Sequence, residues 1–232
     1  MNGISNIEII DFLEVASTTD EFYASESDKA YLKNYDACDD YVLTDSLIHK
    51  IWKDLQSKFN GLDRITKIVN PINILHTNAG TGKVLSECPS HNVMITAMNN
   101  DYICKMISDI LNQKFSVDFN YSSEISDLSH FYINGDNGNN EKFDLIFTQP
   151  SENNYYKGID GTNLENLAPL EYYSSRSLDF LTKGGYLCIL THPRKFNILK
   201  NNKSFKGKVE IVSEIVNKER FEEYGCLICK KK

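Results

Sequence analysis

Apolar residues recur along the chain with two different periods, and the change falls near Pro71. In residues 45–59 they follow the i, i+3, i+4, i+7 spacing of a helix with one buried face. These apolar positions are Leu47, Ile48, Ile51, Trp52, Leu55 and Phe59. The pattern predicts a helix that begins with Thr44 or Asp45 as its N-cap. A similar spacing around Ile7 and Ile10 predicts a second helix in the N-terminal segment.

After Pro71, short apolar runs alternate with helical patterns. The runs predict strands at 72–76, 93–98, 115–119, 142–148, 186–192, 208–216 and 226–230. Helices are expected over 100–113 and 170–182, the second ending at Gly184-Gly185. Alternation of strands and helices predicts an α/β fold with a doubly wound, mostly parallel, seven-stranded sheet. In such sheets ligands bind at the carboxyl ends of the strands.

The 232 residues, 41% hydrophobic and 25% charged, are enough for one sizeable core. We expect an acidic helical arm over 1–40 and one domain over 41–232. No apolar run approaches the roughly 20 residues that span a bilayer, so we expect no membrane contact. No secretion signal is visible, and a cytoplasmic location follows by default. Cys226 and Cys229 have CxxC spacing, but on a strand they point to opposite faces, and no metal site is predicted.

The net charge is −7, and the charge is unevenly distributed. The first 45 residues are rich in Asp and Glu. Residues 194–208 contain no acid and carry the basic residues Arg194, Lys195, Lys200, Lys203, Lys206 and Lys208. This basic segment is either a solvated loop or a flap that contacts phosphates of DNA. The sequence leaves both interpretations open.

A glycine-containing turn follows the strand predicted at 72–76, in the stretch HTNAGTGKVL. A phosphate-binding P-loop would need Gly at Thr77 and Ser or Thr at Val84, so nucleotide hydrolysis is disfavoured. The alternative is a turn that binds a nucleoside, in which Gly80 and Gly82 allow close approach and a following helix offers free N–H groups. An acid often ends the next strand, where it holds ribose hydroxyls. Here Met98 stands at that place.

Six segments, in order over residues 41–195, resemble the catalytic core of adenine-N6 DNA methyltransferases. The likeness is strongest to the modification subunits of type I restriction systems. The segments are YVLTDSLIHKIW, ILHTNAGTGKVL, AMNNDYICKMI, INGD, FDLIFTQPS and LTKGGYLCILTHPRKF. The resemblance implies S-adenosylmethionine as cofactor. It would be bound by Tyr41, Thr44, His76, Asn78, Gly80, Gly82, Met98, Asn99 and Asp136.

The same resemblance places a catalytic tetrapeptide at Thr148, Gln149, Pro150 and Ser151. The family has Asn-Pro-Pro-Phe/Tyr there, where Asn and a Pro carbonyl accept hydrogen bonds from the target amino group and a ring stacks on the flipped base. Only Pro150 matches. The Thr148 hydroxyl reaches less far than an Asn amide and also donates, and Ser151 offers no stacking face. At the cofactor side His76 replaces an acid, which would reverse the local charge.

Three functions remain open from the sequence. The first is an active methyltransferase that uses S-adenosylmethionine on adenine in DNA. The second is a catalytically inactive relative that acts as a binding or regulatory subunit. The third, an NTPase based on GTGK, is the weakest. Because the chain lacks room for a target-recognition domain, sequence specificity would come from a specificity subunit or another protein.

Overall fold

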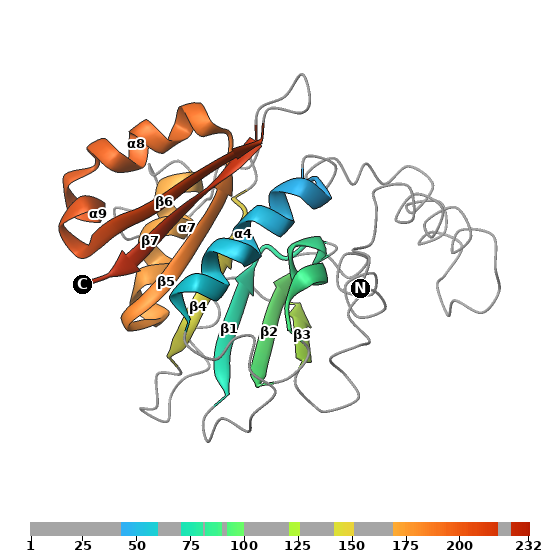
Figure 1. The fold of residues 1–232 in the computed structure, drawn as a ribbon. Helices are drawn as coiled ribbons and strands as arrows, with labels where there is room; N and C mark the ends of the chain where they lie inside the picture. Colours follow the sequence, from blue (N-terminus) through green and yellow to red (C-terminus); the bar gives the residue numbers. More distant parts are fainter. Residues whose placement is uncertain are drawn as a thin grey trace, which may run out of the picture.

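A computed structural model of the chain describes residues 43–59, 71–80, 82–89, 92–99, 121–125, 142–150, 169–217 and 224–232. Seven strands in these ranges form one sheet (Figure 1). They are β1 (Ile72–Thr77), β2 (Val93–Asn99), β3 (Tyr121–Ile125), β4 (Phe143–Thr148), β5 (Leu181–Thr191), β6 (Val209–Asn217) and β7 (Tyr224–Lys231). None of the described helices is long and apolar enough to cross a membrane.

The strand order is β3-β2-β1-β4-β5-β7-β6. The first five strands in this order are parallel, and β7 is antiparallel to both β5 and β6. The sheet is therefore mixed but mostly parallel, which confirms the α/β prediction. Because β6 runs in the same direction as β5, its last residue lies at the same edge as the carboxyl ends of β1 and β4. We call this the carboxyl edge and the opposite one the amino edge.

One face of the sheet is covered by α4 (Asp45–Lys58) and the 3-10 helix η1 (Lys83–Glu87). The helix predicted from the apolar spacing is confirmed, with Thr44 as its N-cap: the Thr44 hydroxyl accepts a hydrogen bond from the Leu47 amide at 3.3 Å. Trp52 anchors α4 by donating from Nε1 to the carbonyl oxygen of Val84 at 2.6 Å. Its ring also packs against Phe147 of β4, with centroids 5.3 Å apart.

The other face is covered by α7 (Pro169–Phe180), α8 (Phe196–Asn201) and α9 (Lys203–Lys208). The short 3-10 helix η3 (Pro193–Lys195) joins β5 to α8. Buried Phe196, Leu199 and Phe205 fix α8 and α9 to the sheet. The basic segment 194–208 is therefore mostly helical, which contradicts the solvated loop, one of the two interpretations that the sequence left open. Three widely spaced apolar side chains suffice to bury one side of the segment.

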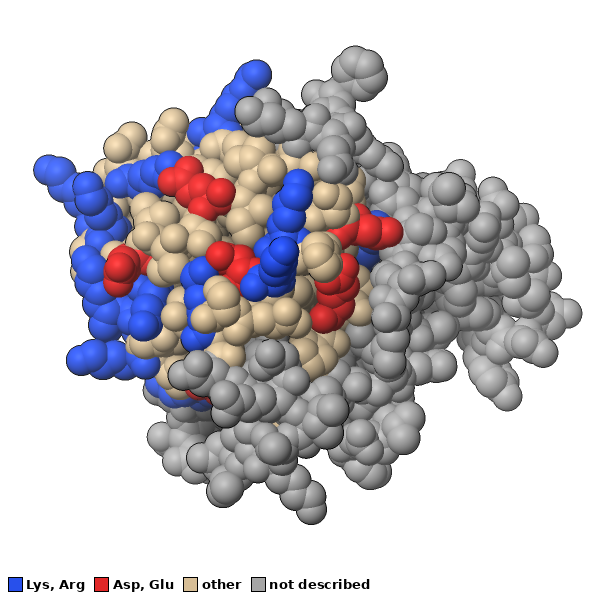
Figure 2. Space-filling view, in the orientation of Figure 1, with Lys and Arg blue, Asp and Glu red and all other residues tan. Residues whose placement is uncertain are grey.

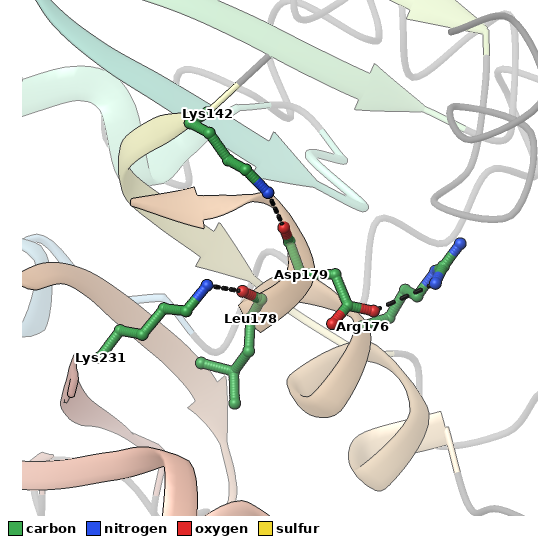
Figure 3. A network of polar contacts seen from close by, with 5 residues as sticks. All are labelled: Lys142, Arg176, Leu178, Asp179 and Lys231. Carbon is green, nitrogen blue, oxygen red and sulfur yellow. Dashed lines mark hydrogen bonds and ion pairs between the residues drawn. The ribbon is translucent and has the colours of Figure 1, made fainter. Parts of the chain in front are cut away.

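The carboxyl end of α7 is held by two lysines (Figure 3). Lys231 donates to the carbonyl oxygens of Leu178 at 2.5 Å and Leu181 at 2.7 Å. Lys142 donates to the carbonyl oxygen of Asp179 at 2.5 Å. The last carbonyls of a helix carry partial negative charge and lack partners within the helix, so these ammonium groups stabilise the end of α7.

The boundary between α7 and β5 differs from the prediction, and two predicted elements are not tested. β5 already begins at Leu181, so α7 ends before the two glycines, and Gly184, with φ 80°, lies inside the strand. The third strand is Tyr121–Ile125, whereas the strand predicted at 115–119 and the helix at 100–113 lie outside the described residues. Cys226 and Cys229 behave as expected, because they belong to the cores on opposite faces of the sheet.

Candidate functional site

The turn after β1 contains three residues with a left-handed backbone. Asn78, Gly80 and Gly82 have φ of 55°, 54° and 72°, a left-handed region that glycine adopts readily. The amide of Ala79 donates to the carbonyl oxygen of Met98 at 2.9 Å, so the turn is tied to the end of β2. Gly80 and Gly82 thus lie where the sequence placed them.

The helix expected after this turn is reduced to the five residues of η1. A single 3-10 segment has no macrodipole comparable to that of a long α-helix, so it offers a ligand little beyond local N–H groups. Lys83 opens η1, and its side chain is only 1% exposed. Its ammonium lies 3.4 Å from a carboxylate oxygen of Asp45 at the start of α4. Because its ammonium is buried in this ion pair, Lys83 is not placed to bind phosphate as the lysine of a P-loop does.

The predicted catalytic turn lies directly beside the glycine turn. In the parallel pair formed by β1 and β4, Thr77 is in register with Thr148. The Thr77 hydroxyl donates to the Thr148 hydroxyl oxygen at 2.8 Å, and the two side chains are 1% and 0% exposed. Gln149 and Pro150 are also buried, and Ser151 lies outside the described residues. The sheet therefore brings both turns together at the carboxyl edge.

His76 is fully buried on the face covered by α4. Its ring contacts Phe147 edge-on, with centroids 5.9 Å apart, and within the described ranges neither ring nitrogen has a hydrogen-bond partner. Burial lowers the pKa of His76 from 6.5 to about 3, because desolvation disfavours the charged ring. His76 is therefore neutral at pH 7. The sequence predicted that His76 would put a positive charge where the resembling family has a negative one. That prediction was wrong, because the buried ring is neutral.

Met98, at the place of the ribose-binding acid, is 1% exposed and packs in the apolar cluster on the opposite face of the sheet. A buried thioether accepts hydrogen bonds only weakly, so it is no substitute for a carboxylate. Asn99 ends β2 in the sheet, next to Met98. Tyr41 and Asp136, two further predicted cofactor residues, lie outside the described residues.

Thr44 lies at the carboxyl edge, but its hydroxyl is already engaged. Besides capping α4, it accepts a hydrogen bond from the side-chain amide of Asn217, the last residue of β6. This contact ties α4 to the far strand of the sheet. Sequence reasoning missed Asn217 and the ion pair between Asp45 and Lys83, because these contacts depend on the register of β6 and on the position of α4.

The structure separates the predicted nucleic-acid residues into two groups. Arg194 and Lys195 follow β5 directly and lie at the carboxyl edge, near the candidate site. Lys203 and Lys206 belong to α9, which leads into the first residue of β6 and therefore lies toward the amino edge. Lys200 pairs with Glu214 at 2.5 Å. The basic segment therefore does not form one surface beside the candidate site.

The described residues contain no group of three or more His, Cys, Asp or Glu side chains that could hold a metal ion. No protein-family model matches the sequence, and no curated protein sequence matches it significantly. Similarity is found among solved structures.

A putative class I S-adenosylmethionine-dependent methyltransferase from Listeria monocytogenes is similar with a TM-score of 0.58 at 15% identity, over 98% of this chain and 68% of that chain. TrmN from Thermus thermophilus is similar with a TM-score of 0.53 at 14% identity. The similarity covers 82% of this chain and 50% of TrmN, so this chain spans half the length of TrmN. The magnesium protoporphyrin IX methyltransferase of Synechocystis, solved with bound S-adenosylmethionine, is similar with a TM-score of 0.53 at 11% identity, over 98% of this chain and 93% of that chain. At these identities the likeness establishes the fold alone: the chain has the α/β fold of class I S-adenosylmethionine-dependent methyltransferases.

Proposed function

We propose that this chain is a catalytically inactive methyltransferase-fold module that serves as a binding or regulatory subunit, related to the adenine-N6 DNA methyltransferases. The observation that carries the proposal is the burial of Thr148. Its hydroxyl stands where the resembling family has its catalytic Asn, yet it is 0% exposed and bonded to Thr77. A buried hydroxyl that already accepts a hydrogen bond from Thr77 is not placed to accept one from a substrate amino group. Methyl transfer depends on that hydrogen bond to position the amino nitrogen.

The cofactor side supports the same proposal. The backbone of the glycine turn fits the approach of a nucleoside ligand. The side chains do not fit S-adenosylmethionine as the resembling family holds it, because His76 is neutral and buried and Met98 is apolar and buried. Thr44 is engaged by Leu47 and Asn217. No methyl-transfer step follows from these residues, and we expect little or no binding of S-adenosylmethionine.

Titration calorimetry with S-adenosylmethionine tests the proposal. We expect no measurable heat of binding at cofactor concentrations up to about 1 mM, a limit that corresponds to about −4 kcal/mol. The matched variant His76→Asp/Met98→Glu restores both acids and should bind more tightly than the wild type if the turn itself is intact. Micromolar binding by the wild type would overturn the proposal.

A methyl-incorporation assay on adenine-containing duplex DNA tests the chemistry separately. Neither the wild type nor Thr148→Asn/Ser151→Tyr should transfer methyl groups, because restoring the tetrapeptide leaves His76 and Met98 unchanged. Circular dichroism and thermal melting confirm that each variant is folded. Methyl transfer by the wild type would establish the second candidate, an active adenine-N6 methyltransferase, which the left-handed glycine turn and Pro150 favour.

A further inference from the structure

Lysines from four separate parts of the chain meet at the amino edge of the sheet. Lys142 immediately precedes β4, Lys208 precedes β6, and Lys183 lies near the start of β5. β7 ends at the same edge, because Lys231 is in register with Val209, the first residue of β6. We call this surface the lysine edge; its members are Lys142, Lys183, Lys206, Lys208, Lys230, Lys231 and Lys232. Figure 2 shows basic side chains gathered on the side of the molecule where α9 and the end of β7 lie.

The backbone holds these side chains close together. The Lys232 amide donates to the carbonyl oxygen of Lys208 at 3.0 Å, and Lys232 Nζ donates to the carbonyl oxygen of Lys206 at 3.3 Å. Burial lowers the pKa of Lys231, and the charges of Lys142 and Lys208 lower it further, while Asp179 opposes them. The lysines therefore create a concentrated positive potential at this edge.

The nearby acids do not neutralise the lysine edge. Asp179 pairs with Arg176 at 3.1 Å. Asp144 accepts hydrogen bonds from the Asn73 amide at 3.1 Å and the Thr182 hydroxyl at 3.3 Å. Glu210, exposed near the start of β6, is a further acid there. Lys230 places its ammonium over the Tyr186 ring, 5.6 Å from the centroid. Among the described residues, the side chains of Lys183, Lys206 and Lys208 form no ion pair, and all three residues are exposed. An acidic chain with net charge −7 thus presents a local surface of available ammonium groups.

We infer that the lysine edge binds the phosphate backbone of duplex nucleic acid without reading its sequence. Lysine ammonium groups act as point charges on phosphates, and this type of contact supplies non-specific affinity. A protein partner fits less well, because interface cores are enriched in aromatic residues and Arg and depleted of Lys. Lysines outnumber arginines at this edge, where Arg176 is engaged by Asp179. The exposed members of the lysine edge are Lys142, Lys183, Lys206, Lys208 and Lys232.

This surface lies at the opposite end of the strands from the glycine turn. A duplex on the lysine edge is therefore not presented to Thr148, and the lysine edge serves to anchor the protein rather than to place a base. The inference is independent of the proposed function, because it requires neither cofactor binding nor its absence.

Fluorescence anisotropy with a labelled DNA duplex of about 20 base pairs and arbitrary sequence tests the inference. If about four phosphates are neutralised, affinity should fall about 100-fold between about 50 and 200 mM salt. The variant Lys206→Gln/Lys208→Gln removes two exposed ammonium groups and should reduce the slope of log K against log salt by about 2. A duplex of different sequence should bind equally well.

Two control variants remove the same charge elsewhere. Lys50→Gln/Lys53→Gln lies on the exposed side of α4, and Arg194→Gln/Lys195→Gln lies at the carboxyl edge. Each control variant should change the affinity by less than about twofold and the slope of log K against log salt by less than about half a unit. Changes of that size are within the scatter of such measurements. The inference is overturned if the Arg194/Lys195 variant alone weakens binding, if all three variants weaken it equally, or if the wild type does not bind the duplex. Binding to phosphatidylserine vesicles without binding to the duplex would also overturn it.

Discussion

Acid should destabilise this protein through one residue in particular, His76. Its imidazole is fully buried beside Phe147, and its pKa is lowered to about 3 by burial. In the unfolded chain the same ring titrates near 6.5. Below pH 6.5 the unfolded chain therefore binds a proton at His76 that the folded protein does not bind, and the free energy of unfolding falls as the pH falls.

The magnitude follows from the two pKa values. One pKa unit corresponds to about 1.4 kcal/mol, so the full difference is about 5 kcal/mol, reached only below about pH 3. At about pH 5 the loss attributable to His76 is about 2 kcal/mol. Above about pH 7 the ring is neutral in both states, and its titration contributes nothing. The effect is thus confined to the window between pH 6.5 and 3.

The assay is urea unfolding at about pH 7.5 and pH 5, for the wild type and His76→Leu. The loss of unfolding free energy between the two pH values should be about 2 kcal/mol smaller in the variant. At pH 7.5 the variant should be as stable as the wild type or more so, because it removes buried ring nitrogens that lack partners in the described structure. His49→Leu, on the exposed side of α4, is the control. The reasoning is refuted if the free energy of unfolding depends equally on pH in the wild type and in His76→Leu. The folded protein would then bind a proton at His76 as readily as the unfolded chain does.

Three further predictions concern stability, each measured by urea unfolding. Thr148→Val should lower the free energy of unfolding by about 1–2 kcal/mol, and the double variant Thr77→Val/Thr148→Val should lower it by less than the sum of the single changes, because the two hydroxyls bond each other. Lys231→Met should cost about 1 kcal/mol by releasing two carbonyls at the end of α7; unchanged stability would contradict the capping role. Gly225→Ala should destabilise by about 1–3 kcal/mol, because its Cβ would lie 2.5 Å from a backbone oxygen of β6. Gly207→Ala, with open space around it, should be neutral or stabilising.

The sequence predicted elements well where burial sets a clear period. α4 was found because its apolar residues repeat at helical spacing, and the strands buried on both faces appear as apolar runs. β3 was missed because Tyr121–Ile125 contains Ser122, Ser123 and Glu124, a polar composition that an edge strand tolerates. The helices of 194–208 were missed because Lys and Asn dominate their composition.

For the candidate site, the sequence predicted positions better than roles. The neighbouring turns follow from parallel strands, which place their carboxyl ends at one edge, and this was predictable. The bond between Thr77 and Thr148 was not, because it depends on the register of β1 with β4. The neutral state of His76 was missed for a related reason: only packing decides whether a buried imidazole finds a partner, and here Phe147 contacts it instead.

The separation of the two edges constrains what the molecule does. In an enzyme that methylates a base, the phosphates next to the target must lie within reach of the turn that holds the base. Here the exposed ammonium groups of Lys206 and Lys208 lie at the amino edge, whereas Thr148 is sealed at the other end of the same strands. Phosphate binding at the lysine edge therefore does not help chemistry at the carboxyl edge. A subunit that holds nucleic acid while another subunit acts on it has no need of such coupling, and this arrangement agrees with a binding role for the chain.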